Sequence, residues 1–286
     1  MTDTYVSCHT VAMTTGSPTI ARRVLGTSLR NHRESRRITR TTAGAAIGYA
    51  HQTIQRIEEG TQATREHQVR GLCQLYGVPE DEIAELCRYA KEGAKRGWWE
   101  SYKEGMPPEF RAFAETEAEI AAMHTVELEH VPGIIQTDGY LRAAQTAALP
   151  FPEEKLRAVR RLRQLRQERL FRRDPLPELH IVLGQSALLY LRRLGDVGDE
   201  QLRRIRDVAA LPTADVRVAV ELHPAMACSF TILTPGPPLP GAPFVFIDAV
   251  HGGRYEEGRD VVSLYERTFA AAHEMAIPVE EYIHGW

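Results

Sequence analysis

The hydrophobic positions between Ile20 and Tyr89 recur three and four residues apart, which is the spacing of one helix face. Glycines and helix-capping residues separate the short runs that show this spacing. Five helices are therefore predicted: 20–36, 40–47 with Thr39 as N-cap, 51–59 ending at Gly60, one capped by Thr64 and ending at Gly77, and one opened by Pro79.

The pattern changes after about residue 108, where alternating, β-branched segments separate the helices. Helices are predicted at 109–122, 139–149, 153–173, 200–210 and 260–275. Strands or extended segments are predicted at 124–133, 179–184, 215–222, 228–233 and 243–250, and the glycine-rich 250–258 is expected to form a turn. The expected fold class is an N-terminal all-α five-helix domain followed by an α+β domain.

Charge is distributed unevenly, although the 286 residues carry a formal net charge of only -3. Arginines crowd the segment 22–40, in which Glu34 is the only acidic residue. A local basic face matters more for phosphate binding than the global sum of charges. On composition alone, a solvated arginine-rich helix explains the segment equally well.

Cysteine spacing and hydropathy exclude several classes of protein. The four cysteines form no C-x-x-C pair and have no histidine at zinc-ligand spacing, so no metal, no cofactor and a reducing compartment are expected. No apolar run approaches the roughly 20 residues that span a bilayer, and the first residues lack the features of a secretory signal. A cytoplasmic, nucleoid-associated protein without membrane contact is expected.

The segment 40–58 meets the steric demands of a helix-turn-helix, in which two short helices join at a tight turn. The small Gly44 stands where the helices are expected to cross, and Gly48 permits the turn. Tyr49 is expected to fill the remaining apolar position of the turn. The apolar residues expected to attach this unit to the core are Ile47, Ile54 and Ile57. A helical bundle that does not bind DNA is the alternative.

The second helix of such a unit can enter the major groove of DNA, which is wide enough for a helix. Glutamine pairs with adenine and arginine with guanine through two hydrogen bonds each. The predicted base-reading residues are His51, Gln52 and Arg56. The predicted phosphate contacts are Arg40, Thr41, Thr42, Thr61 and Gln62.

These residues lie in a stretch that resembles the Xre, or phage-repressor-like, family of five-helix DNA-binding domains. The likeness covers about residues 20–90, including IQRIEEG and GLCQLYGVPEDEI. It implies base reading at the positions already named, with Gln55 flanking, and the first helix adds Arg30 or Arg33 to the phosphate contacts. Gly44 departs from the family, where alanine is usual, and costs the helix roughly 1 kcal/mol by propensity.

The remainder resembles the C-terminal domain of the WhiJ-like proteins, actinobacterial Xre regulators of development and antibiotic production. The likeness covers about residues 108–280 and includes EHVPGIIQTDGYLRAA, RRLRQLRQERL and LHIVLGQSALLYLRRLG. It implies a regulatory domain that senses a ligand or a small partner protein. Two positions depart from the family: Gln185 stands where an acid is usual, and Asp248 where glutamate is common.

Four segments result from this division of the chain. Residues 1–18 are expected to be a disordered leader, and 19–92 a helix-turn-helix DNA-binding domain. Residues 93–108 form the expected linker, whose Trp98 and Trp99 pack a domain junction. Residues 109–286 form the expected α+β regulatory and dimerisation domain.

The predicted function is that of a sequence-specific DNA-binding transcription regulator. A homodimer is expected on an inverted repeat in double-stranded DNA, controlled by a small-molecule effector or partner protein. No catalytic residue is assigned, because no nucleophile elbow, P-loop or paired histidines at metal spacing occur.

Two alternatives stay open at this point. One is an antitoxin-like protein-interaction switch whose DNA binding is autoregulatory, with an acidic partner on Arg160, Arg161, Arg163 and Arg166. A solvated amphipathic helix explains the same arginines. The other is a small-molecule receptor around Val182, Val218, Phe230 and Phe246.

Overall fold

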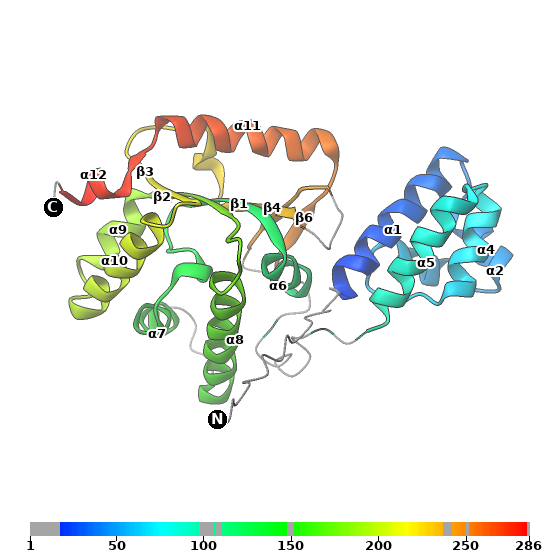
Figure 1. Ribbon diagram of the computed structural model, residues 1–286, viewed down its shortest axis with the longest axis horizontal. Helices are drawn as coiled ribbons and strands as arrows, with labels where there is room; N and C mark the ends of the chain where they lie inside the picture. Colours follow the sequence, from blue (N-terminus) through cyan, green and yellow to red (C-terminus); the bar gives the residue numbers. More distant parts are fainter. Residues whose placement is uncertain are drawn as a thin grey trace, which may run out of the picture.

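A computed structural model describes residues 18–95, 97, 106, 110–147, 152–236, 242–249 and 252–284. The expected leader, except its last residue, and the tryptophan pair of the expected linker lie outside the described residues. Within the described part, a helical N-terminal domain stands beside a larger domain built on one sheet (Figure 1). The expected fold class is confirmed.

The N-terminal domain consists of five helices at the predicted places. They are α1 Pro18–Ser35, α2 Arg40–Ile47, α3 His51–Glu58, α4 Glu66–Tyr76 and α5 Glu80–Gly93. Thr39 is the N-cap of α2, and its side chain accepts a hydrogen bond from the Thr42 N–H. The prediction of Thr64 as the cap of α4 is wrong. Thr64 is buried, Arg65 takes the N-cap position, and the Arg65 N–H donates to the Gln68 side chain at 2.8 Å.

One hydrophobic core joins these helices. Ile54 and Ile57 of α3 are fully buried against Leu25 and Leu29 of α1 and Leu72 of α4. Burial of these apolar side chains fixes the rotation of α3 about its axis, so the opposite face of α3 must point outward.

The C-terminal domain is organised around a mixed seven-stranded sheet of order β6-β5-β4-β1-β2-β3-β7. The central strands β1, β2 and β3 are parallel, and the remaining neighbours pair antiparallel. The strands are β1 Ile120–Glu127, β2 Glu178–Gly184, β3 Ala214–Ala219, β4 Phe230–Pro235, β5 Phe244–Ile247, β6 Arg254–Glu256 and β7 Ile277–Pro278.

Helices cover both faces of this sheet (Figure 1). One face carries α6 Arg111–Ala118, α7 Asp138–Ala147, α8 Glu153–Phe171, α9 Gln185–Leu191 and α10 Asp196–Ala209, with the short 3-10 helix η3 Gly133–Ile135. The other face carries α11 Arg259–Met275, with a second 3-10 helix, η4 Pro224–Ala227. The chain continues into α12 Val279–His284. The parallel strands are therefore buried on both sides, as their apolar runs require.

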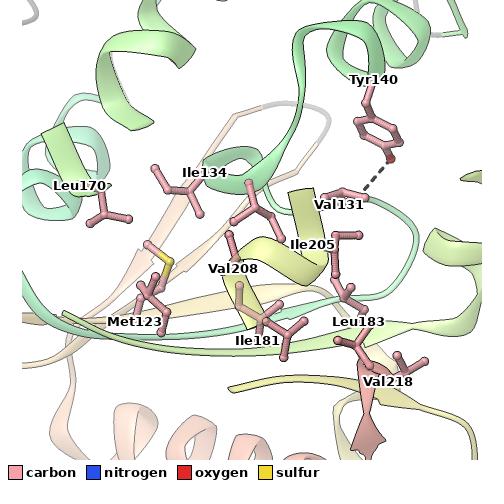
Figure 2. Packing of buried hydrophobic residues seen from close by; sticks show 14 of the residues in the cluster. Met123, Val131, Ile134, Tyr140, Leu170, Ile181, Leu183, Ile205, Val208 and Val218 are labelled. Atoms are coloured by element: carbon pink, nitrogen blue, oxygen red, sulfur yellow. Dashed lines mark hydrogen bonds between the residues drawn. The ribbon is translucent and has the colours of Figure 1, made fainter. Parts of the chain in front are cut away.

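The two larger clusters of the core lie one on each face of the sheet, and a small third cluster joins α6 to α8. Figure 2 shows the larger cluster, in which Ile181 and Leu183 of β2 lie close to Ile205 and Val208 of α10. Nearby, the Val131 N–H donates to the Tyr140 hydroxyl at 3.2 Å. This bond joins α7 to the loop that follows β1.

Two predictions for this domain are wrong. The helix expected at 109–122 ends at Ala118, and Glu119 has non-helical φ and ψ of -130° and 23°. Strand β1 then starts at Ile120, four residues before the expected extended segment. Because β1 pairs with both β2 and β4, tertiary pairing overrides the helix propensity of an Ala- and Glu-rich stretch. The expected turn at 250–258 contains the edge strand β6.

Candidate functional site

The turn between α2 and α3 is unusually close. Gly48 adopts a left-handed conformation with φ of 76°, and the Tyr49 N–H donates to the Gly44 carbonyl at 2.8 Å. A Cβ on Gly44 would lie 2.4 Å from the Tyr49 carbonyl oxygen. Glycine at 44 therefore lets the turn fold directly over α2. Tyr49 itself is 38% exposed, so its expected place in the apolar part of the turn is wrong.

Helix α3 presents a polar face to solvent. His51, Gln52 and Arg56 are exposed, while Ile54 and Ile57 on the opposite side are buried. The structure thus brings the three predicted base-reading residues together on one surface. Gln55 is half-buried beside them, and its amide donates to Glu59 at 2.8 Å. The chain after α3 turns back on itself, because the Thr61 N–H and hydroxyl both donate to the Arg56 carbonyl.

The predicted phosphate contacts divide into two groups. Arg30, Thr41, Thr42 and Thr61 are exposed, and Arg40 and Gln62 are half-buried. Among these, Arg30 donates to the neighbouring Glu34 at 3.1 Å. Arg33 is different, because it is 7% exposed and lies beneath α3. A side chain so deeply buried does not reach a phosphate on the surface.

The partner of Arg33 is Glu58, a buried carboxylate that the sequence analysis did not assign. Arg33 donates to both Glu58 oxygens at 2.5 and 2.9 Å, and Arg40 donates to one of them at 2.8 Å. The two arginines thereby join α1 and α2 to the last residue of α3. The sequence does carry a signal for this contact. The segment 22–40 has many arginines and a single acidic residue, so a carboxylate that pairs with a buried arginine has to come from another helix.

A second contact missed from the sequence links the two domains. Arg23 of α1 forms an ion pair with Glu257, and its guanidinium carbon lies 4.0 Å from the ring centroid of Tyr255. Arg23 also lies directly against Gly60, which follows the end of α3. A cleft of about 930 Å³ beside this contact is lined by Arg30, Arg40 and the first turns of α11. The C-terminal domain therefore contacts the N-terminal domain next to the residues predicted to contact phosphate.

The four arginines of α8 do not form one exposed docking face. Arg160 pairs with Asp138, Arg163 donates to Gln136, and Arg166 is buried against Glu117. Among the four, Arg161 alone is exposed. The apolar receptor set is divided too: Val182 and Val218 are fully buried in the core, whereas Phe230 and Phe246 line a cavity.

Three further expectations concern metals, thiols and membranes. Cys73, Cys87 and Cys228 are free, and burial raises the pKa of Cys73 to about 12. Within the described part of the chain, no cluster of three or more His, Cys, Asp or Glu side chains is placed to hold a metal ion. Of the helices in the same residues, none has the length and hydropathy to cross a membrane.

The fold and the exposed face of α3 define a two-domain protein with an N-terminal helix-turn-helix unit. Residues 24–86 match the family model of a helix-turn-helix domain, and residues 110–284 match a domain of unknown function, DUF5753. The second match covers more than half of the chain, so the protein belongs to the family that carries this domain. No curated protein and no solved structure matches the chain. The helix-turn-helix match indicates a DNA-binding regulator, while the Xre and WhiJ-like assignments stay resemblances.

Proposed function

We propose that the protein is a transcription regulator that reads a specific DNA sequence with the exposed face of α3. The observation that carries this proposal is the division of α3 into a buried apolar face and an exposed face formed by His51, Gln52 and Arg56. These three side chains offer hydrogen bonds that suit base edges in the major groove. Gln55 flanks them, with its amide engaged by Glu59.

Phosphate contacts would come from the residues that surround this face. Arg30, Arg40, Thr41, Thr42, Thr61 and Gln62 are all at least partly exposed. Arg33 is assigned a structural role instead, because it is buried and donates hydrogen bonds to both carboxylate oxygens of Glu58. The first backbone N–H groups of α2 add a further place for a phosphate, since a helix start favours anions.

The active form is proposed to be a homodimer on an inverted repeat. A single five-helix domain of this kind contacts one half-site, and two-fold pairing doubles the contacts. The C-terminal domain is proposed to supply dimerisation and to receive a ligand or partner signal. The contact of Arg23 with Tyr255 and Glu257 supports such a role, because it attaches that domain beside the recognition helix.

The test is an in vitro selection of genomic fragments by the full-length protein, followed by sequencing. We expect an enriched inverted repeat whose half-sites lie about one helical turn apart. The Gln52→Ala variant is carried in parallel and should lose the enrichment. Fragments retained without any shared motif, with strong salt sensitivity, would contradict sequence-specific reading and favour a protein partner as the main target.

A further inference from the structure

A cavity of about 560 Å³ lies between strands β1, β4 and β5 of the sheet and the helices α6 and α8. Its size is in the range of small-molecule sites, roughly 300 to 1,000 Å³. Aromatic side chains form much of its apolar wall. They are Phe110, Phe113 and Phe246, with Met123 beside them. Such a wall suits a ligand with a flat apolar body.

The polar groups of this cavity are held in fixed positions. Arg166 is 5% exposed, donates to both oxygens of Glu117 at 2.6 Å, and lies over the Phe110 ring at 4.7 Å. Thr125 and Thr231 on neighbouring strands are hydrogen-bonded to each other. In these contacts the polar groups form hydrogen bonds with one another, so this part of the cavity wall is formed before any ligand binds.

Arg163 also lines the cavity, but its charge has no such partner. Its one hydrogen bond goes to the Gln136 side chain at 2.6 Å, and no carboxylate of the described residues forms an ion pair with it. Burial and the nearby Arg166 lower the pKa of Arg163 to about 9. The guanidinium remains cationic at neutral pH and keeps free donors for an acid group.

Glu127, the last residue of β1, presents the opposite charge to the same cavity. Burial raises the pKa of Glu127 to about 7, which the Asp248 charge reinforces and a hydrogen bond from Ser229 opposes. Within the described residues no cation lies within ion-pair distance of Glu127, although the charge of Arg163, which lines the same cavity, also opposes the rise in its pKa. An ammonium group placed here would restore the ionised carboxylate, since an opposite charge favours the charged form.

We propose that this cavity binds a small zwitterion with a flat apolar body, whose acid group pairs with Arg163 and whose amino group pairs with Glu127. The aromatic wall holds the body of the ligand. A ligand with only a negative charge would pair with Arg163 but would face the carboxylates of Glu127 and Asp248. A ligand with only a positive charge would pair with Glu127 but would face the guanidinium of Arg163. The binding of this ligand does not depend on the proposed function. Its role as the signal that regulates DNA binding does rest on that function.

The test is calorimetric titration of the full-length protein with three probes that share a phenyl group. L-Phenylalanine carries both charges, 3-phenylpropanoate only the acid, and 2-phenylethylamine only the amine. We expect L-phenylalanine to bind at least about tenfold more tightly than either. Arg163→Gln should weaken the two acids and spare the amine, and Glu127→Gln should weaken the two amines and spare the acid.

Arg161→Gln is the matched control, because Arg161 is exposed on the same helix and lies outside the cavity. It should change none of the affinities. Circular dichroism checks each variant; should Arg163→Gln fail to fold, the near-isosteric Glu127→Gln decides. Binding of none of the probes at up to roughly 10 mM, or equal binding of 3-phenylpropanoate and L-phenylalanine, would overturn the proposal. These titrations contain no DNA, so failure of the DNA selection leaves their result unaffected.

Discussion

The guanidinium carbon of Arg23 lies 4.0 Å from the ring centroid of Tyr255, although 231 positions of sequence separate the two residues. Tyr255 is also fixed from within its own domain. Its hydroxyl accepts a hydrogen bond from the Phe113 N–H at 2.9 Å, and its ring packs on Phe246 at 5.0 Å. Phe113 and Phe246 both line the cavity described above. A ligand there would touch the residues that hold Tyr255 against α1.

Replacing Arg23 by glutamine should loosen this junction and leave both domains folded. A cation over an aromatic ring contributes about 0.5 to 2 kcal/mol, and the ion pair with Glu257 is lost as well. We expect faster hydrogen exchange in β6 and in the first turns of α1, measured by mass spectrometry. Arg30→Gln is the control, since Arg30 pairs within its own helix. Equal exchange in all three proteins would show that Arg23 does not hold the junction.

Gly44→Ala separates helix propensity from the geometry of the turn. Alanine favours a helix by about 1 kcal/mol over glycine. The added Cβ, however, would meet the Tyr49 carbonyl oxygen at 2.4 Å, and overpacking of this kind costs about 1 to 3 kcal/mol. The midpoint of urea unfolding should therefore fall. Ala46→Gly, at an exposed position of the same helix, reports propensity alone. A Gly44→Ala variant more stable than the parent would disprove the close approach.

Arg33 and Arg40 bind the same carboxylate but should behave differently in DNA binding. Arg33→Met leaves a buried Glu58 with one partner, and breaking a buried pair costs about 3 to 5 kcal/mol. Its main effect should be a loss of stability to urea. Arg40→Ala should weaken specific and random DNA alike and reduce the slope of log K against log salt by about 1. An unchanged slope would remove Arg40 from the phosphate contacts.

The helical N-terminal domain was predictable because its structure is local. Thr39, Gly48, Gly60 and Gly77 act within one or two turns of their own position, and each lies where the capping rules place it. The N-cap of α4 was predicted one residue too early, at Thr64. The choice between Thr64 and Arg65 depends on the Gln68 side chain, which accepts a hydrogen bond from the Arg65 N–H. The direction of the exposed face of α3 was also predictable, because Ile54 and Ile57 mark the face that is buried.

The larger errors arise where distant segments meet. Strand β1 was half hidden in a helix-like sequence, because its pairing with β2 and β4 decides its conformation. The role of Glu58 required knowing that α1 and α2 converge on the end of α3. The cavity joins Arg163 of α8 to Glu127 of β1, and no spacing rule relates those two elements.

Gln52→Ala tests base reading directly. Gln52 is exposed in the first turn of α3, so its removal should leave stability within about 0.5 kcal/mol of the parent. A paired contact to a base contributes about 1 to 3 kcal/mol of discrimination. Binding to the selected site should weaken by that amount, while binding to random DNA stays the same in fluorescence anisotropy. Equal losses on both would place Gln52 among the phosphate contacts.

Three histidines that stack where α11 packs on strands β1 and β2 should make stability fall on acidification. The His124 and His180 rings lie 5.0 Å apart on neighbouring strands, and His273 of α11 lies 5.4 Å from His180. Burial lowers the pKa of His124, reinforced by His180, and burial also lowers the pKa of His273, reinforced by Arg217. Glu178 and Asp215 oppose these shifts but do not reverse them.

The sign follows from the folded and unfolded states. Because the folded pKa is below the ordinary 6.5, the unfolded chain takes up protons first as the pH falls. Stability present above about pH 6.5 is therefore lost as the pH falls toward the folded pKa. His124→Phe keeps a ring against Phe269, which stacks on His124 at 4.8 Å, and removes one titrating group.

Urea unfolding at pH 7.5 and 5.5 should show a smaller loss of stability for His124→Phe than for the parent. Glu127 acts in the opposite direction over this range, since its raised pKa favours the folded state on acidification. It is common to both proteins and cancels in their difference. The same loss in parent and variant would mean that His124 is solvated well enough to titrate normally, and the stack would then have no part in the acid response.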